Sequence, residues 1–230
     1  MKKIAFVVPL LITFQVLQAQ VTVRVDNTIL NTGGFGFQVM GVMPAGAAEM
    51  VDLVKGSPFY NDTWIKSKVV TEKGAIFQDV PIKVNLYDQT IHYQDASGKE
   101  MVTTTPLSEI LFDKDAGKNR VHFINGNLLP GGKKGWYQLL VNDQLTLVKG
   151  FKKFLETHTS YNTAKQFSIN TSELYSVFYK GTEYEMKRPG DMIDILPNKK
   201  AEIESHIKKN NKGSKEEQLR SVVTFANTLL

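Results

Sequence analysis

The sequence contains no cysteine among its 230 residues. This absence excludes disulfide bonds, thiolate ligands for a metal and a cysteine nucleophile. It also excludes a lipoprotein anchor, because that lipid is attached to a cysteine at the processing site. The fold must therefore rest on its core, and a chain of this length is long enough to bury one.

Motifs for metal binding, cofactor binding and catalysis are also missing. The chain has four histidines: His92, His122, His158 and His206. They are not spaced as metal ligands, so we expect no metal site. The glycine-rich segments 33–36 and 131–135 do not match a nucleotide-binding loop, and no hydrolase nucleophile motif is present. Asp113–Gly117 matches only the start of a calcium loop and is predicted to be a turn. We therefore predict no catalytic residue and no cofactor.

Long apolar runs are absent after the first twenty residues. No later stretch reaches the roughly 18 apolar residues of a membrane-spanning helix, so none is expected in the mature chain. Met1–Lys3 is positively charged, Ile4–Ile12 is apolar except for Pro9, and Ala19 is small. This pattern predicts a signal peptide over residues 1–19, cleaved between Ala19 and Gln20. We expect export to the periplasm or cell surface, without a cysteine-linked lipid.

The remaining composition is that of a folded protein. Apolar residues make up 42% and charged residues 22% of the chain, which argues against global disorder. Removal of Lys2 and Lys3 with the signal peptide lowers the formal charge from +5 to +3. This mild excess favours weak attraction to anionic surfaces without identifying a partner. Export argues against nucleic acid.

Alternating apolar and polar residues predict a series of strands between residues 20 and 187. In Val80–Tyr87, every second residue from Val80 to Leu86 is apolar. Short strands at roughly ten-residue spacing, joined by tight turns, are typical of an antiparallel meander. Residues 27–55 are glycine-rich and are expected to form an irregular segment packed on the core. We predict a mainly β (β-rich α+β) fold, an antiparallel meander curled into a sandwich or an open barrel.

The composition changes after Pro189, and residues 188–230 are predicted to be helical. A first helix is expected from Asn198, as its cap, to about Lys209. Ser214 and Glu217 have the spacing of a capping box, followed by apolar residues along one helix face. We therefore predict a C-terminal helical hairpin docked on the sheet.

Four segments resemble a widespread group of secreted proteins from Bacteroidota: Gly56–Asp62, Val80–Tyr87, Gly135–Val141 and Leu196–Glu204. The resemblance covers most of residues 56–228. The shared segments are turns and strands without chemical motifs. The resemblance implies an exported, β-rich protein, and because the group has no established activity it implies no function.

Four aromatic residues are candidates for ligand binding: Trp64, Tyr93, Trp136 and Tyr137. If they were exposed together on one face of the sheet, they could stack against sugars or a peptide. If they lay in the core, they would fill volume, as large aromatic side chains commonly do. The partner expected from these residues is an envelope protein or a glycan.

The sequence leaves three functions open. We favour a non-enzymatic binding or structural module of the cell envelope. A carrier of an apolar ligand within a curled sheet is the second, and it requires a continuous apolar cavity. The third is a hydrolase that uses carboxylates such as Asp88, Asp95 and Glu109. It requires two acids that converge in a cleft, one of them with a raised pKa.

Overall fold

The computed structural model describes residues 22–24, 54–112, 120–158 and 166–230. The predicted signal peptide, with Ala19 and Gln20 at its cleavage site, lies outside these ranges. So do the segment Asp113–Gly117 and residues 27–53 of the glycine-rich segment. The last two residues of that segment, Val54 and Lys55, form a short strand.

The strands occupy most of the described chain. They are β1 (Thr22–Arg24), β2 (Val54–Lys55), β3 (Ile65–Thr71), β4 (Ile76–Asn85), β5 (Thr90–Gln94), β6 (Glu100–Val102), β7 (Leu107–Phe112), β8 (Val121–Asn125), β9 (Trp136–Val141), β10 (Thr146–His158), β11 (Gln166–Tyr179) and β12 (Thr182–Glu185). The helices are η2 (Gly126–Leu128), η3 (Pro189–Asp191), α2 (Met192–Ile195), η4 (Pro197–Lys199), α3 (Lys200–Lys209) and α4 (Lys215–Asn227). No helix in the described ranges is long and apolar enough to cross a membrane.

Within these ranges, ten strands follow one open antiparallel path. Their order is β12-β11-β10-β9-β8-β7-β3-β4-β5-β6. Strands β3 to β6 and β7 to β12 are two meanders, and the pairing of β3 with β7 joins them. Strands β1 and β2 join by parallel pairing, to β4 and β11 respectively. The predicted mainly β, antiparallel fold is confirmed, and its sheet is not closed into a complete barrel.

A first core fills the inner face of strands β3 to β9. The alternation predicted in Val80–Tyr87 places Val80, Ile82 and Val84 of β4 in this core. Phe112 of β7 and Phe123 of β8 are among its largest fully buried side chains. Because their rings contact each other at a centroid distance of 5.7 Å, the interior of the curled sheet is filled by side chains.

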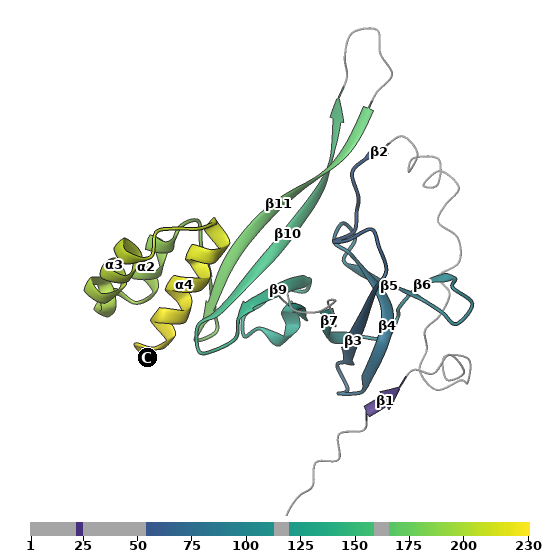
Figure 1. Ribbon diagram of the computed structural model, residues 1–230, viewed down its shortest axis with the longest axis horizontal. Coiled ribbons are helices and arrows are strands. Elements are labelled where there is room, and N and C mark those ends of the chain that lie inside the picture. The colour runs from purple at the N-terminus through teal and green to yellow at the C-terminus, as the bar shows by residue number, and fades with distance from the viewer. Residues whose placement is uncertain (1–21, 25–53, 113–119, 159–165) are drawn as a thin grey trace, which may run out of the picture.

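A second core lies between the helices and strands β9 to β11. The helices pack at one end of the sheet, on the opposite side of the molecule from β3 to β6 (Figure 1). Leu219, Val222 and Val223 of α4 are almost completely buried there, together with Leu147 and Val177 of the sheet. The predicted helical hairpin is therefore confirmed, because its apolar face covers apolar sheet residues.

The beginning of α3 differs from its prediction. Asn198 lies in η4, and the cap of α3 is Lys199, whose side chain makes no capping hydrogen bond. Pro197 explains the difference, because proline suits the first position of a helical turn and here starts a separate short one. The predicted capping box of α4 is correct: Ser214 accepts from the Glu217 amide, and Glu217 accepts from the Ser214 amide.

Strands β10 and β11 have 13 and 14 residues and are longer than the short strands at roughly ten-residue spacing that the sequence predicts. They pair from Thr146–Phe178 to His158–Gln166 without a break. Their distal halves leave the body of the protein as a two-stranded arm (Figure 1). The alternation ends where the arm begins because Lys152 and residues 154–157 of β10 are exposed to solvent, on both faces of the strand.

Candidate functional site

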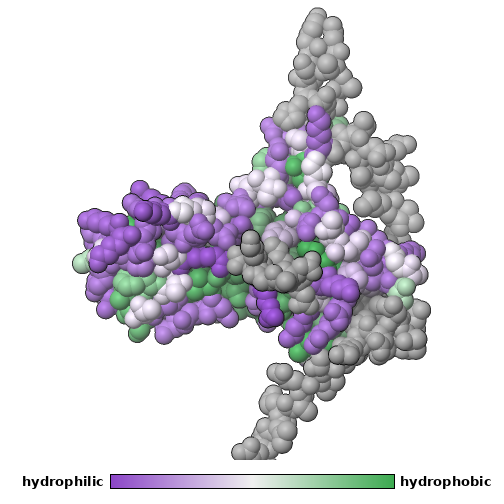
Figure 2. Space-filling model, viewed as in Figure 1, coloured by the Kyte–Doolittle hydropathy of each residue, from purple (hydrophilic) through white to green (hydrophobic). Residues whose placement is uncertain are grey.

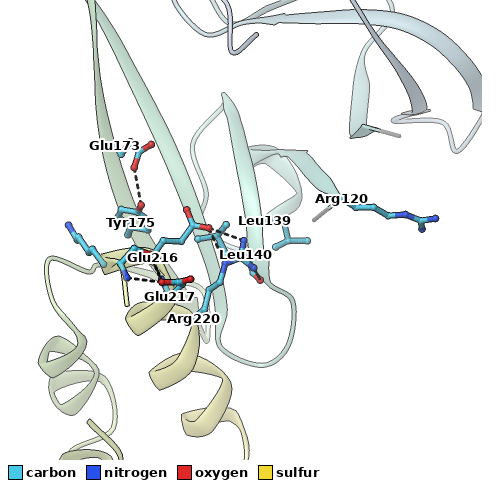
Figure 3. Close-up of a pocket in the computed structure, with 10 residues that line it drawn as sticks. Arg120, Leu139, Leu140, Glu173, Tyr175, Glu216, Glu217 and Arg220 are labelled. Atoms are coloured by element: carbon cyan, nitrogen blue, oxygen red, sulfur yellow. Dashed lines mark hydrogen bonds and ion pairs between the residues drawn. The ribbon is translucent and has the colours of Figure 1, made fainter. Parts of the chain in front are cut away.

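A charged cleft of about 840 Å³ lies between the start of α4 and strands β9 and β11 (Figure 3). Glu173 and Tyr175 project into it from β11, and Glu216 and Arg220 from α4. The helix begins at the Ser214 cap, so its first turn forms one wall of the cleft. The cleft is therefore built from segments that lie far apart in the sequence.

Lys149 of β10 is the centre of an ion-pair network beside this cleft. Its Nζ lies 3.1 Å from Oε1 of Glu173 and 2.9 Å from Oε2 of Glu216. The Arg220 guanidinium binds the second carboxylate oxygen of Glu216, also at 3.1 Å. Tyr175 donates its hydroxyl proton to Oε2 of Glu173 at 2.9 Å. The network thus joins two neighbouring strands to α4.

The network fixes the charge state of its members. Burial lowers the pKa of Lys149, but its hydrogen bonds to Glu216 and Glu173 outweigh burial and raise the pKa overall. Burial raises the pKa of Glu216, and the contacts with Lys149 and Arg220 outweigh it, so that pKa is lowered. Burial, followed by the hydrogen bond to Glu173, raises the pKa of Tyr175 to about 12. These three groups therefore do not exchange protons near neutral pH.

The polar contacts around the cleft attach α4 to the sheet. Arg220 donates from Nη1 to the Leu140 carbonyl of β9 at 2.8 Å. At the other end of α4, the Asn227 amide accepts from the Leu145 N–H at 2.8 Å and donates to the Leu145 carbonyl at 3.0 Å. Helix α4 is therefore held at both ends by hydrogen bonds to the sheet. The charged side chains of the cleft therefore have a structural role, because they attach α4 to the sheet.

A groove of different character lies around the start of β9. It consists of two adjoining hollows of about 270 Å³ and 370 Å³, which share Gln89, Lys134 and Trp136. The loop before β9 contributes Lys134, and the turn between β4 and β5 contributes Gln89. Because both hollows share these residues, they lie side by side, with Gln89, Lys134 and Trp136 between them.

The two hollows differ in the chemistry of their walls. The smaller has an apolar wall of Tyr137, Phe151 and Leu174, and Leu174 is 46% exposed although it is a large apolar side chain. The larger is lined mainly by hydroxyl and amide groups, from Thr90, Thr103, Thr104, Thr105, Asn125 and Asn127. The groove therefore offers an apolar platform beside hydroxyl and amide groups, and its walls also contain charged side chains, among them Glu72, Lys134 and Glu183.

Gln89 fixes the boundary between the hollows. Its backbone has a φ of +62°, in the left-handed region that non-glycine residues seldom adopt. Its side chain accepts from the Trp136 N–H at 2.8 Å and donates to the Leu86 carbonyl at 2.7 Å. One side chain thus joins the β4–β5 turn to β9. Strained residues held by their surroundings are typical of binding sites, because they position groups in advance.

Glycines hold the loop Gly126–Gly135 tightly against its surroundings. A Cβ on Gly126 would lie 1.9 Å from the Lys133 carbonyl oxygen, and one on Gly132 would lie 2.3 Å from the Gly126 oxygen. The Gly126 N–H also donates to the Gly135 carbonyl at 2.8 Å. Because only glycine permits these approaches, the loop presents Lys134 at a defined place in the groove wall.

The structure brings together two of the four predicted ligand-binding residues. Trp136 and Tyr137 both line the groove, although Trp136 is only 6% exposed and serves as wall. Tyr93 is buried in the first core, and burial raises its pKa to about 12. Trp64 lies elsewhere, with the Lys83 ammonium 4.4 Å from its ring centroid. Whether Trp136 and Tyr137 bind a ligand remains a prediction.

The histidines and the candidate carboxylates make separate local contacts. His92 Nδ1 lies 2.6 Å from Glu100, and His122 Nε2 lies 2.8 Å from Glu109. Asp88 accepts from Thr90, and Asp95 accepts from Ser97 in a turn; this hydrogen bond helps lower the Asp95 pKa. The described residues contain no cluster of three or more His, Cys, Asp or Glu side chains that could hold a metal ion.

Two residues of these sites were missed by the sequence reasoning. Gln89 follows Asp88 in a tight turn between two predicted strands, and a glutamine where glycine or asparagine is usual is a sequence signal of a special role. Lys149 lies two residues after Leu147 and two before Phe151, so all three share one face of a strand, and the apolar neighbours mark that face as buried.

Comparisons with known protein families, curated proteins and solved structures found no match to this chain.

Proposed function

We propose that this protein is an exported, non-enzymatic binding module of the cell envelope, and that it binds a glycan in the groove around Gln89. The observation that carries the proposal is the geometry of Gln89. A left-handed backbone and two hydrogen bonds hold the shared boundary of the two hollows in place. The signal-peptide pattern and the resemblance to secreted Bacteroidota proteins support export.

The chemistry of the groove fits a sugar. A pyranose ring presents hydroxyl groups around its edge and an apolar C–H surface on its faces. The larger hollow supplies threonine hydroxyls and asparagine amides, which both donate and accept hydrogen bonds. The smaller supplies the exposed Leu174 and the ring of Tyr137 for an apolar face. A site with an apolar wall and a few fixed polar groups is the usual form of a small-molecule site.

The two alternative functions have less support. The carrier requires an apolar cavity, whereas Phe112, Phe123 and Ile110 fill the interior of the curled sheet. The hydrolase requires a carboxyl group with a raised pKa. The pKa values that depart from the ordinary range among the described carboxyl groups are lowered, at Asp95, Asp191, Glu216 and Glu217. Binding without proton transfer therefore suits these residues better.

Binding is tested with the purified protein on a glycan microarray, followed by calorimetry with the best sugar. Asn127→Trp places a large ring in the hydroxyl-lined hollow and should weaken binding at least about tenfold, a loss of about 1.4 kcal/mol. Asn211→Trp is the matched control, since Asn211 is an exposed loop residue outside the groove. Equal affinities of the two variants would place the site elsewhere. Binding to peptides but not to sugars would overturn the ligand class.

Export is tested separately by expressing the full chain in a Gram-negative bacterium. We expect periplasmic or extracellular protein whose first residue is Gln20, identified by mass spectrometry of the intact chain. Protein that stays in the cytoplasm with residues 1–19 attached would contradict export.

A further inference from the structure

The arm formed by β10 and β11 has an unpaired edge. Beyond Gly150, β10 pairs with β11 alone, and within the described ranges no strand lies along its other edge. On the far side of the arm, β2 pairs with β11 at Phe167 and Ser168. The backbone groups along Lys152–His158 of β10 therefore form an edge to which another strand can add.

The arm is also poorly buried. Phe154 and Leu155 are 40% and 37% exposed, and as neighbours in a strand they lie on opposite faces. Figure 2 shows hydrophobic residues among hydrophilic ones on the visible side of the arm. The two-residue strand β2 covers only one edge of the arm, and additional strands stabilise a hairpin that is marginally stable by itself in water. The arm thus has both an open edge and apolar side chains that such strands would cover.

We propose that the arm is a dimerisation surface, on which β10 pairs antiparallel with β10 of a second copy of this chain. The four strands would then run in the order β11-β10-β10-β11 across a two-fold axis. A second copy is the partner proposed because β10 is complementary to itself, so the same strand supplies both sides of the contact. The proposal is independent of the groove and of its ligand.

Charge selects one register for this pairing. When a two-fold axis perpendicular to the sheet relates the two copies of β10, residues that lie directly opposite each other point to the same face. Because side chains alternate between the faces along a strand, the numbers of two opposite residues are both even or both odd, and their sum is even. With Phe154 opposite its own copy, each Lys152 lies opposite Glu156, which gives two ion pairs around an aromatic pair. In the neighbouring register centred on Leu155, Phe154 would lie opposite Glu156. The Phe154-centred register therefore matches both apolar and charged residues.

The charges that this register pairs lie on the Phe154 face of the arm. Asn170 of β11, opposite Phe154, donates to Oε2 of Glu156 at 2.6 Å, so the register needs the other carboxylate oxygen of Glu156 for Lys152 of the second copy. Lysines on an edge commonly prevent strand addition. Here, however, Lys153 donates its ammonium proton to the Ser57 carbonyl at 2.8 Å, within the same molecule. The remaining lysine, Lys152, is the one that faces an opposite charge in the dimer.

The absence of native cysteine allows a direct test of the register in the full chain. In an antiparallel pair, opposite Cα atoms are about 4.5–5.5 Å apart, within the range of a disulfide. Phe154→Cys should therefore form a disulfide-linked dimer under mild oxidation. Thr157→Cys is the control, because the two copies of residue 157 would lie about 20 Å apart along the strands. Equal cross-linking of the two variants would refute the register.

Charge exchange tests the same contact without a cross-link. Sedimentation velocity on the unmodified chain should show a monomer–dimer equilibrium. Lys152→Glu should raise the dimer dissociation constant about tenfold, and Lys152→Glu combined with Glu156→Lys should restore most of the affinity. A chain that stays monomeric at high concentration would overturn the proposal. A dimer whose dissociation constant is the same in both variants as in the unmodified chain would exclude the β10 edge as its interface.

Discussion

Replacement of Lys149 by methionine tests whether the charged cleft holds α4 on the sheet. Methionine keeps a long apolar stem and removes only the ammonium group. Glu173 and Glu216 then lose their shared cation, although Arg220 still binds Glu216. The apolar packing of the stem is largely kept, so the change in stability reports mainly on the charge network.

The expected loss follows from the burial of the three side chains. Hydrogen bonds to charged groups contribute about 1.5–3 kcal/mol each when well shielded. The side chains of Lys149 and Glu216 are 12% and 26% exposed, whereas that of Glu173 is 46% exposed and water replaces much of its contact. We therefore expect Lys149→Met to lower the free energy of unfolding by about 2–3 kcal/mol, mostly through Glu216.

The network also sets a dependence on pH. Because the folded-state pKa of Glu216 is lowered from its ordinary value of 4.5, its contribution to stability is present above that value. The contribution is lost as the pH falls through the lowered folded-state pKa. In Lys149→Met this pKa should move up toward its ordinary value. The stability of the variant should therefore depend less on pH in the acid range.

Urea denaturation followed by tryptophan fluorescence measures both effects. Lys149→Met, Glu216→Gln and the double variant form a cycle, in which we expect a coupling energy of about 1 kcal/mol or more. Lys66→Met, an exposed lysine of β3, is the matched control and should change stability by less than about 0.5 kcal/mol. If Lys149→Met unfolds at the same urea concentration as the unchanged protein at every pH, the network does not anchor α4.

Two further substitutions test the elements that surround the cleft and the groove. Gly126→Ala should destabilise the protein by about 1–3 kcal/mol and weaken glycan binding, because its Cβ would meet the Lys133 carbonyl oxygen. Gly190→Ala, with open space around the added carbon, should do neither in the same denaturation and calorimetry measurements. Asn227→Leu leaves the backbone N–H and carbonyl of Leu145 without their partner and should lower the Tm by about 4–8 °C, measured by circular dichroism. An unchanged Tm would show that water replaces the amide without cost.

Local patterns in the sequence were sufficient for several elements of the fold. The alternation from Val80 to Leu86 places every second side chain on one face of a strand, whatever that strand pairs with, and all four of these residues are buried. The capping box of Ser214 and Glu217 depends on residues three apart, so it could be predicted before the helix had a partner.

The sequence could not predict how these elements combine. The pairing of β3 with β7 joins residues about 40 positions apart, for example Ser67 with Phe112, and no local pattern encodes it. The arm was missed for a related reason. Lys152 and residues 154–157 of β10 are exposed, on both faces of the strand, so the burial that produces alternation elsewhere is absent there.

The candidate sites show the same division between local pattern and tertiary structure. The sequence marks Trp136 and Tyr137 as candidates only because they are large aromatic residues. Only the folded chain brings Gln89 to the Trp136 backbone, and only it brings Lys149 between Glu173 and Glu216. A hydrogen bond or an ion pair requires two groups within a few ångströms of each other. Local periodicity determines which way each side chain faces, whereas the pairing of distant strands and helices determines what it meets.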